Sequence, residues 1–261
     1  WHSALSRSTT RAGVTLIGVA IGRYPWLKMN RATIALVGAT LLIALGALTL
    51  DAAYRAVDWN TILLLFGMMV LNVNLRTSGF FHLVTAHVLE RAHTPRRLLA
   101  LLVGTSGLLS AIFLNDTIVL VFTPLVLEIV LALRRNPLPY LVGLVTAANI
   151  GSVATITGNP QNMLVGLSSG ISYVDFTRAL GPIALLGLGV IWVVIVLVYP
   201  REFKAERLET GHIELPPPNY RRLRKALLAT VLMIVALVIG APIPLAAALA
   251  AALLLISRKL E

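Results

Sequence analysis

Residues 149–163 of this 261-residue chain read NIGSVATITGNPQNM, which places a polar break inside the apolar run Leu141–Val165. A second break, Asn115-Asp116-Thr117, separates the apolar runs Leu98–Leu114 and Ile118–Leu133. Backbone breaks at membrane depth are tolerated only where the chain is enclosed by protein or lines a cavity. If these runs lie in a bilayer, the two breaks predict a polar site within it.

The composition indicates a membrane protein. Hydrophobic residues make up 57% of the chain and charged residues 13%, whereas a soluble domain is about 25% charged. This excludes a soluble enzyme, a disordered chain and a collagen-like fibre. The net charge of +11 does not indicate nucleic-acid binding, because the basic residues lie between the apolar runs. The chain has no Cys, so disulfides and thiolate metal sites are excluded within it.

We expect an all-α polytopic membrane protein built as an inverted-repeat secondary transporter. The first transmembrane repeat covers residues 12–199. It contains a re-entrant hairpin at about 98–133 and a broken helix at about 138–166. A linker follows at residues 200–222, and residues 223–257 form the first two helices of the second repeat.

Basic loops set the expected orientation. They lie at Arg23–Arg31, at Arg91–Arg97, at Arg134-Arg135 and between Arg201 and Lys225. Cytoplasmic loops are enriched in Lys and Arg. All four loops share one side only if the segment 98–133 enters and leaves the bilayer by the same face. We therefore expect a re-entrant hairpin, a cytoplasmic linker at 200–222 and a location in the cell (inner or plasma) membrane.

The inverted repeat rests on two similar stretches. Ala12–Leu50 and Ala226–Ile256 each read as a short helix, a proline-containing turn and an Ala/Leu-rich helix. The expected topology makes them cross the membrane in opposite directions, as in many secondary transporters. Because the second unit stops after two helices, we expect that the chain is part of a longer protein.

The hairpin tip has a structural and a functional interpretation. Asn115, Asp116 and Thr117 are all residue types that cap helix N-termini. A helix N-terminus can also bind an anion, and an ionisable residue inside a membrane is a functional candidate. Asp116 either carries a proton or contacts Na⁺, or it is held by the N–H groups that it caps.

The second break has a denser set of polar groups. Asn159 suits an N-cap and Pro160 suits the first helical position, where its missing N–H costs nothing. A proline kink alone would not require so many amides, so we interpret this break as a ligand site. Its predicted residues are Thr157, Gly158, Asn159, Pro160, Gln161 and Asn162. Carbonyls freed by unwinding can hold a cation, which we expect to be Na⁺ near Asn115, Asp116 and Gly158.

The motifs at these breaks resemble a known group of proteins. Residues 113–117 (FLNDT), 122–124 (FTP) and 149–163 are similar to first-repeat signatures of the ion transporter superfamily, in its arsenite-permease and citrate-transporter-like group. The resemblance implies a re-entrant hairpin and an unwound helix in each repeat, often within a homodimer. It also implies that residues 115–117 and 157–162 bind substrate or coupling ion. Dicarboxylate carriers of the group tend to have Ser-Asn-Thr at the tip, whereas Asn-Asp-Thr resembles arsenite and Na⁺/H⁺ members.

We therefore expect a secondary-active transporter of a small anion, either an inorganic oxyanion such as arsenite or a carboxylate, coupled to H⁺ or Na⁺. The alternative is a Na⁺/H⁺ antiporter that uses Asp116 as the exchanging carboxylate. The chain lacks the HExxH pattern of metalloproteases, and no enzyme and no resident cofactor are expected. The expected partners are the oxyanion substrate, the lipid bilayer and a second copy of the chain.

Overall fold

The computed structural model describes residues 13, 17, 20, 30–204, 208 and 216–256, and these form helices and turns without a strand. This confirms the all-α prediction. The chain divides into two units, Trp1–Trp59 and Asn60–Glu261. Most of the predicted helix at 12–22, most of the first basic loop, residues 205–207 and 209–215 of the linker, and residue 257 lie outside the described residues.

Between residues 30 and 59, the first unit contains two short helices. Helix α2 (Arg31–Ala44) begins at the N-cap Asn30, whose side chain accepts a hydrogen bond from the Thr33 amide. It ends well before the apolar run does, because Gly46 adopts a left-handed conformation with φ of 67°. Helix α3 (Leu50–Ala56) follows, with Thr49 as its N-cap.

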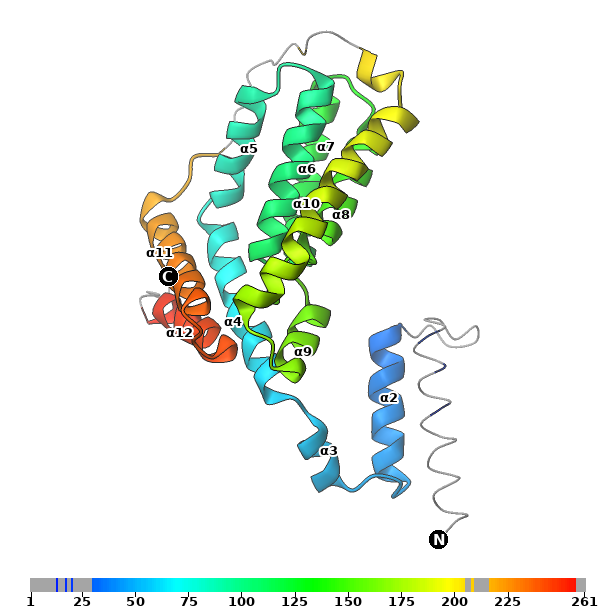
Figure 1. Ribbon diagram of the computed structural model, residues 1–261, viewed down its shortest axis with the longest axis vertical. Helices are drawn as coiled ribbons and strands as arrows, with labels where there is room; N and C mark the ends of the chain where they lie inside the picture. The colour runs from blue at the N-terminus through cyan, green and yellow to red at the C-terminus, as the bar shows by residue number, and fades with distance from the viewer. Residues whose placement is uncertain are drawn as a thin grey trace. The chain divides into compact units, whose positions relative to one another are not determined.

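The second unit is built around a hairpin, a broken helix and a long helix (Figure 1). The hairpin consists of α6 (Pro95–Ile112) and α7 (Asn115–Ala132), joined by Phe113-Leu114. Both legs pack against α8 (Pro137–Ser152), which is followed after a non-helical stretch by α9 (Pro160–Ser169). Helix α10 (Tyr173–Val198) packs along α8 and α6.

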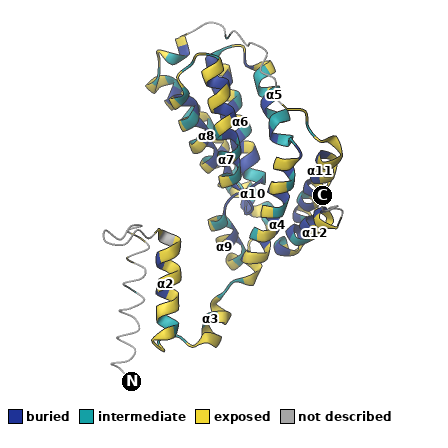
Figure 2. Cartoon of the chain, turned by 180° about the vertical axis from the view of Figure 1, so that it is seen from behind, coloured by how far each residue is buried: buried dark blue, intermediate teal, exposed yellow. Residues whose placement is uncertain are grey.

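Helix lengths show how far each part reaches. The 26 residues of α10 extend over about 39 Å and each 18-residue hairpin leg over about 27 Å, compared with about 30 Å for the hydrocarbon core of a bilayer. Within the described part of the chain, three helices are long and apolar enough to cross a membrane: Trp59–Thr77, Asn115–Ala132 and Tyr173–Val198. The outward side of α10 is apolar, with Leu186 at 72% and Leu197 at 71% exposure; Figure 2 colours the exposed residues of the chain yellow. Such a surface suits lipid rather than water.

The base of the hairpin is fixed by the 3₁₀ helix η1 (Glu202–Lys204). The Glu202 carboxylate accepts a hydrogen bond from the Tyr140 hydroxyl (3.2 Å) and pairs with Arg135 (3.8 Å) at the end of α7. The Arg96 Nε, at the start of α6, donates to the Phe203 carbonyl (3.1 Å). Both legs therefore have their bases at the same end of the unit, beside the start of α8.

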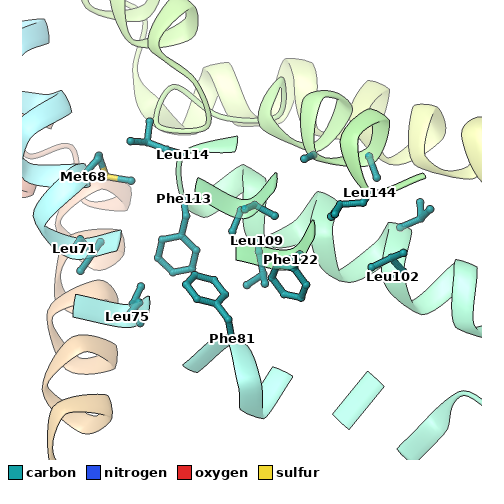
Figure 3. Packing of buried hydrophobic residues seen from close by; sticks show 14 of the residues in the cluster. Met68, Leu71, Leu75, Phe81, Leu102, Leu109, Phe113, Leu114, Phe122 and Leu144 are labelled. Atoms are coloured by element: carbon teal, nitrogen blue, oxygen red, sulfur yellow. The ribbon is translucent and has the colours of Figure 1, made fainter. Parts of the chain in front are cut away.

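Two further helices support the hairpin tip from the side. Helix α4 (Trp59–Thr77) presents Met68 and Leu71 toward Phe113 (Figure 3). Helix α5 (Phe80–Arg91) places Phe80 edge-on to Phe113, with ring centroids 6.2 Å apart, and its neighbour Phe81 edge-on to Phe122 at 5.7 Å. This packing fixes the apolar side of the turn that precedes the polar tip.

The last two helices pack against each other. They are α11 (Tyr220–Val238) and α12 (Ile243–Leu255). The Asn219 amide donates to the Ser78 carbonyl (2.9 Å), which joins the start of α11 to the end of α4. A Cβ atom on Gly67 would lie 2.7 Å from the backbone of Ala247, so α4 and α12 are in close contact. Whether these helices begin an inverted repeat stays a prediction.

Candidate functional site: two breaks in contact

The hairpin and the broken helix approach each other through glycine. A Cβ atom built on Gly151 would lie 2.1 Å from the Gly107 carbonyl oxygen, a distance that no side chain can occupy. Small residues allow this kind of backbone approach between membrane helices. The crossing of α6 and α8 lies within two turns of both breaks and thereby brings them together.

Helix α8 ends at Ser152. The backbone carbonyls at this end and just after it accept hydrogen bonds from side-chain amides that follow the break. The Asn162 Nδ2 donates to the carbonyls of Ser152 (3.1 Å), Val153 (3.3 Å) and Thr155 (2.9 Å). The Asn159 Nδ2 adds a bond to the Ser152 hydroxyl (3.0 Å). Carbonyls without partners are costly in lipid, and two side-chain amides remove this cost.

Helix α9 begins as its sequence predicts. Asn159 is the N-cap, Pro160 occupies the first turn, and the Asn159 Oδ1 accepts from the Asn162 amide at 2.8 Å. Pro160 has no N–H, and the Met163 amide donates to the Asn159 carbonyl (3.1 Å). Among the described residues nothing accepts a hydrogen bond from the Gln161 amide, which leaves one backbone donor at this helix start.

The tip of the hairpin differs from the prediction. The N-cap of α7 is Leu114, which cannot cap with its side chain, and the three polar residues lie inside the first turn. The Asn115 Oδ1 accepts from the Asp116 amide (2.9 Å). The amides of Thr117 and Ile118 both donate to the Leu114 carbonyl, at 3.0 and 3.2 Å. The expectation that side chains cap the bare amides here holds for Asn115 alone; for Asp116 and Thr117 it is wrong, because the next amides bind the Leu114 carbonyl instead.

Asn115 joins the two breaks directly. Its backbone amide donates to the Gly158 carbonyl (3.0 Å), and its Nδ2 donates to the Asn149 Oδ1 (3.0 Å). Gly158 is itself close-packed, because a Cβ there would lie 2.2 Å from the Ser152 carbonyl oxygen. The start of α7 is therefore attached to the middle of the broken helix.

Threonine hydroxyls extend this contact. The Thr155 hydroxyl donates to the Ala111 carbonyl near the end of α6 and lies 3.3 Å from the Thr157 hydroxyl. The Thr157 hydroxyl in turn lies 3.4 Å from the Tyr173 hydroxyl at the start of α10. Sequence reasoning missed Tyr173, since nothing local relates it to the break.

The predicted site residues divide into buried and accessible groups. Thr157, Gly158 and Asn159 are buried, Asn115, Thr117, Pro160 and Asn162 are partly buried, and Asp116 and Gln161 are exposed. Among the described residues, no side chain pairs with or donates to the Asp116 carboxylate, and no three or more His, Asp and Glu side chains gather as a metal site. The place where the two breaks meet therefore offers one carboxylate, amide groups and a free backbone N–H on its accessible side.

A helical hairpin in contact with an unwound helix, beside the apolar outward face of α10, is the architecture of a polytopic membrane protein. The citrate transporter family model matches residues 16–261, and the chain belongs to this family.

Known relatives are transporters or membrane proteins. The chain is 37% identical over 180 residues to the silicon efflux transporter LSI3 of Oryza sativa subsp. japonica, covering 68% of this chain and 37% of that protein. It is 34% identical to a 46 kDa membrane protein of Mycobacterium leprae (68% of this chain, 42% of that protein). It is 26% identical to the putative transporter arsB of Dictyostelium discoideum (68% and 32%). The chain thus spans about two fifths of the length of its relatives.

Proposed function

We propose that this protein is a secondary-active transporter whose substrate and coupling ion bind where the two breaks meet. The observation that carries the proposal is the pair of bonds from Asn115 to Gly158 and Asn149. They hold a carboxylate, amides and a helix N-terminus in one place, within a surface otherwise suited to lipid. Polar groups of this cost are retained in membrane proteins for function.

The chemistry favours a small oxyanion, neutral or singly charged, over a tricarboxylate. Neither break contains a Lys or Arg, and the exposed Asp116 repels a multiply charged anion unless a cation binds beside it. The Gln161 amide N–H and nearby hydroxyls suit an oxyanion or an uncharged hydroxy acid. A silicon transporter and an arsB protein among the relatives agree with this substrate class.

Asp116 is the proposed coupling group, binding H⁺ or Na⁺. In proteoliposomes that contain the product of the complete reading frame, Asp116→Asn is expected to lower gradient-driven uptake of arsenite or germanic acid at least tenfold. The matched control is Asp175→Asn, which removes an exposed carboxylate paired with Arg178 at the start of α10. Equal uptake by wild type and Asp116→Asn would contradict the assignment.

A Na⁺/H⁺ antiporter is the second candidate, favoured by the unpaired Asp116 carboxylate. It predicts that Na⁺ or Li⁺ collapses a preformed pH gradient without any oxyanion. The same vesicles distinguish the two functions, because a coupled oxyanion carrier moves protons only when its substrate is present.

We also propose a multi-pass orientation in the cell membrane with the linker 200–222 in the cytoplasm, and a homodimer as the family resemblance implies. The contacts of η1 with Arg96 and Arg135 support one side for the basic loops. These 261 residues contain no Cys, so single cysteines report topology. We expect Arg97→Cys and Arg134→Cys to react with an impermeant maleimide from the cytoplasm and Ser168→Cys from outside. Labelling of positions 97 and 134 from opposite sides would contradict the hairpin.

A further inference from the structure

The start of α11 carries a concentrated positive charge that the transport site does not use. Four of its first six residues are basic: Arg221, Arg222, Arg224 and Lys225. All four are exposed, and none forms a salt bridge with any residue that the structure describes. Charges in this position are available to a partner of opposite sign.

These basic residues border a surface hollow whose lining changes from charged to apolar along α11. The hollow has a volume of about 750 Å³; Arg221, Arg224 and Lys225 line one part, and Leu227, Leu228 and Val231 line the other. Tyr220 lies at the charged end and is 66% exposed, as is usual for tyrosine at a membrane interface. The opposite face of α11 is buried, so this face does not belong to the core.

The distance along α11 from the basic residues to the apolar ones matches the depth of one lipid leaflet. Arg221, Arg224, Leu228 and Val231 follow one another at intervals of three or four residues, so they share one face of the helix. From Arg221 to Val231 the helix rises about 15 Å, which is half of the hydrocarbon thickness of a bilayer. A headgroup at the arginines would place its acyl chain along the leucines.

We propose that this face of α11 is a binding site for an anionic phospholipid. Its phosphate is held by Arg221, Arg224 and Lys225, and one acyl chain lies along Leu228 and Val231. The apolar half distinguishes this occupant from nucleic acid or a soluble anion, which would leave Leu228 (60% exposed) without a partner. Arg91 and Arg97 do not line this hollow, so they provide a charge-matched control.

The experiment measures lipid retained by the purified product of the complete reading frame, using phosphatidylglycerol and phosphatidylcholine as the probes. Mass spectrometry of the intact protein, titrated with each lipid in detergent, gives the affinities. We expect phosphatidylglycerol to bind more tightly than phosphatidylcholine. We expect Arg221→Gln with Arg224→Gln to weaken phosphatidylglycerol binding about tenfold or more, since each basic residue near an anionic lipid contributes about one kcal/mol.

Two comparisons make the proposal falsifiable. Arg91→Gln with Arg97→Gln removes the same charge from another exposed basic loop and is expected to leave the affinity unchanged. Leu228→Ser with Val231→Ser keeps the charge and is expected to weaken phosphatidylglycerol binding but not binding of glycerol phosphate. Equal loss in both arginine pairs, no preference for phosphatidylglycerol, or no effect of the serine pair would overturn the site. Thermal melting of each variant checks that it is folded, and none of these measurements depends on the transported substrate.

Discussion

Gly151→Ala is expected to lower the melting temperature of the detergent-solubilised protein by about 10 °C or more. The added Cβ would lie 2.1 Å from the Gly107 carbonyl oxygen and 2.4 Å from its Cα. These are backbone atoms, so no side chain can rotate away, and α6 and α8 would have to separate. Ordinary overpacking costs about 1–3 kcal/mol, and a clash between two helix backbones exceeds this range.

The control for this prediction lies three residues from the same crossing. Gly104→Ala, also in α6, meets no heavy atom within 4 Å and is expected to be neutral or stabilising, since alanine favours a helix by about 1 kcal/mol over glycine. Gly107→Ala is expected to cost less than Gly151→Ala, because its Cβ would meet the side chain of Leu188 on α10 (2.6 Å), which can move, and not a helix backbone. If Gly151→Ala melts like Gly104→Ala, the close approach of the two helices is wrong.

The parts of this fold that sequence could predict are those encoded locally. The Asn-Pro pair at 159–160 starts α9 as predicted, because the cap and the proline act on their own helix turn. The all-helical membrane fold followed from apolar runs of sufficient length. The early end of α2 was missed, since Gly46 lies inside a run whose hydropathy does not change there.

The parts that sequence could not predict depend on contacts between distant residues. Asn115 was expected to cap α7, and its Oδ1 does accept from the Asp116 amide, but its backbone N–H and its Nδ2 also bind Gly158 and Asn149, 43 and 34 residues later. Nothing in the hairpin's own sequence specifies these acceptors. Gly107 and Gly151 did carry a signal, since small residues in membrane helices mark close crossings, but the pattern alone does not say which glycines meet. The role of the joined residues in ligand binding stays a prediction.

Asn162→Asp is expected to reduce transport by about 100-fold while changing no side-chain volume. The Asn162 Nδ2 donates to the carbonyl of Ser152 at the end of α8 and to those of Val153 and Thr155 in the break, and an aspartate oxygen in its place would face these carbonyls with like charge. Losing buried hydrogen bonds costs about 1–3 kcal/mol for each group left without a partner. The break would reorganise, and with it the position of Gly158 against Asn115.

The matched control uses the same substitution at another helix cap. The Asn136 side chain only accepts a hydrogen bond, from the Leu138 amide at 3.1 Å, so Asn136→Asp keeps this bond and is expected to retain wild-type flux. The initial rate of oxyanion uptake is compared at equal amounts of reconstituted protein. Normal flux in Asn162→Asp would show that the amide of Asn162 is dispensable. Of these two side chains, only the Asn162 amide donates hydrogen bonds across the break, whereas the Asn136 amide donates none to any residue that the structure describes. A selective loss of flux at position 162 would therefore show that transport depends on the non-helical geometry of the break.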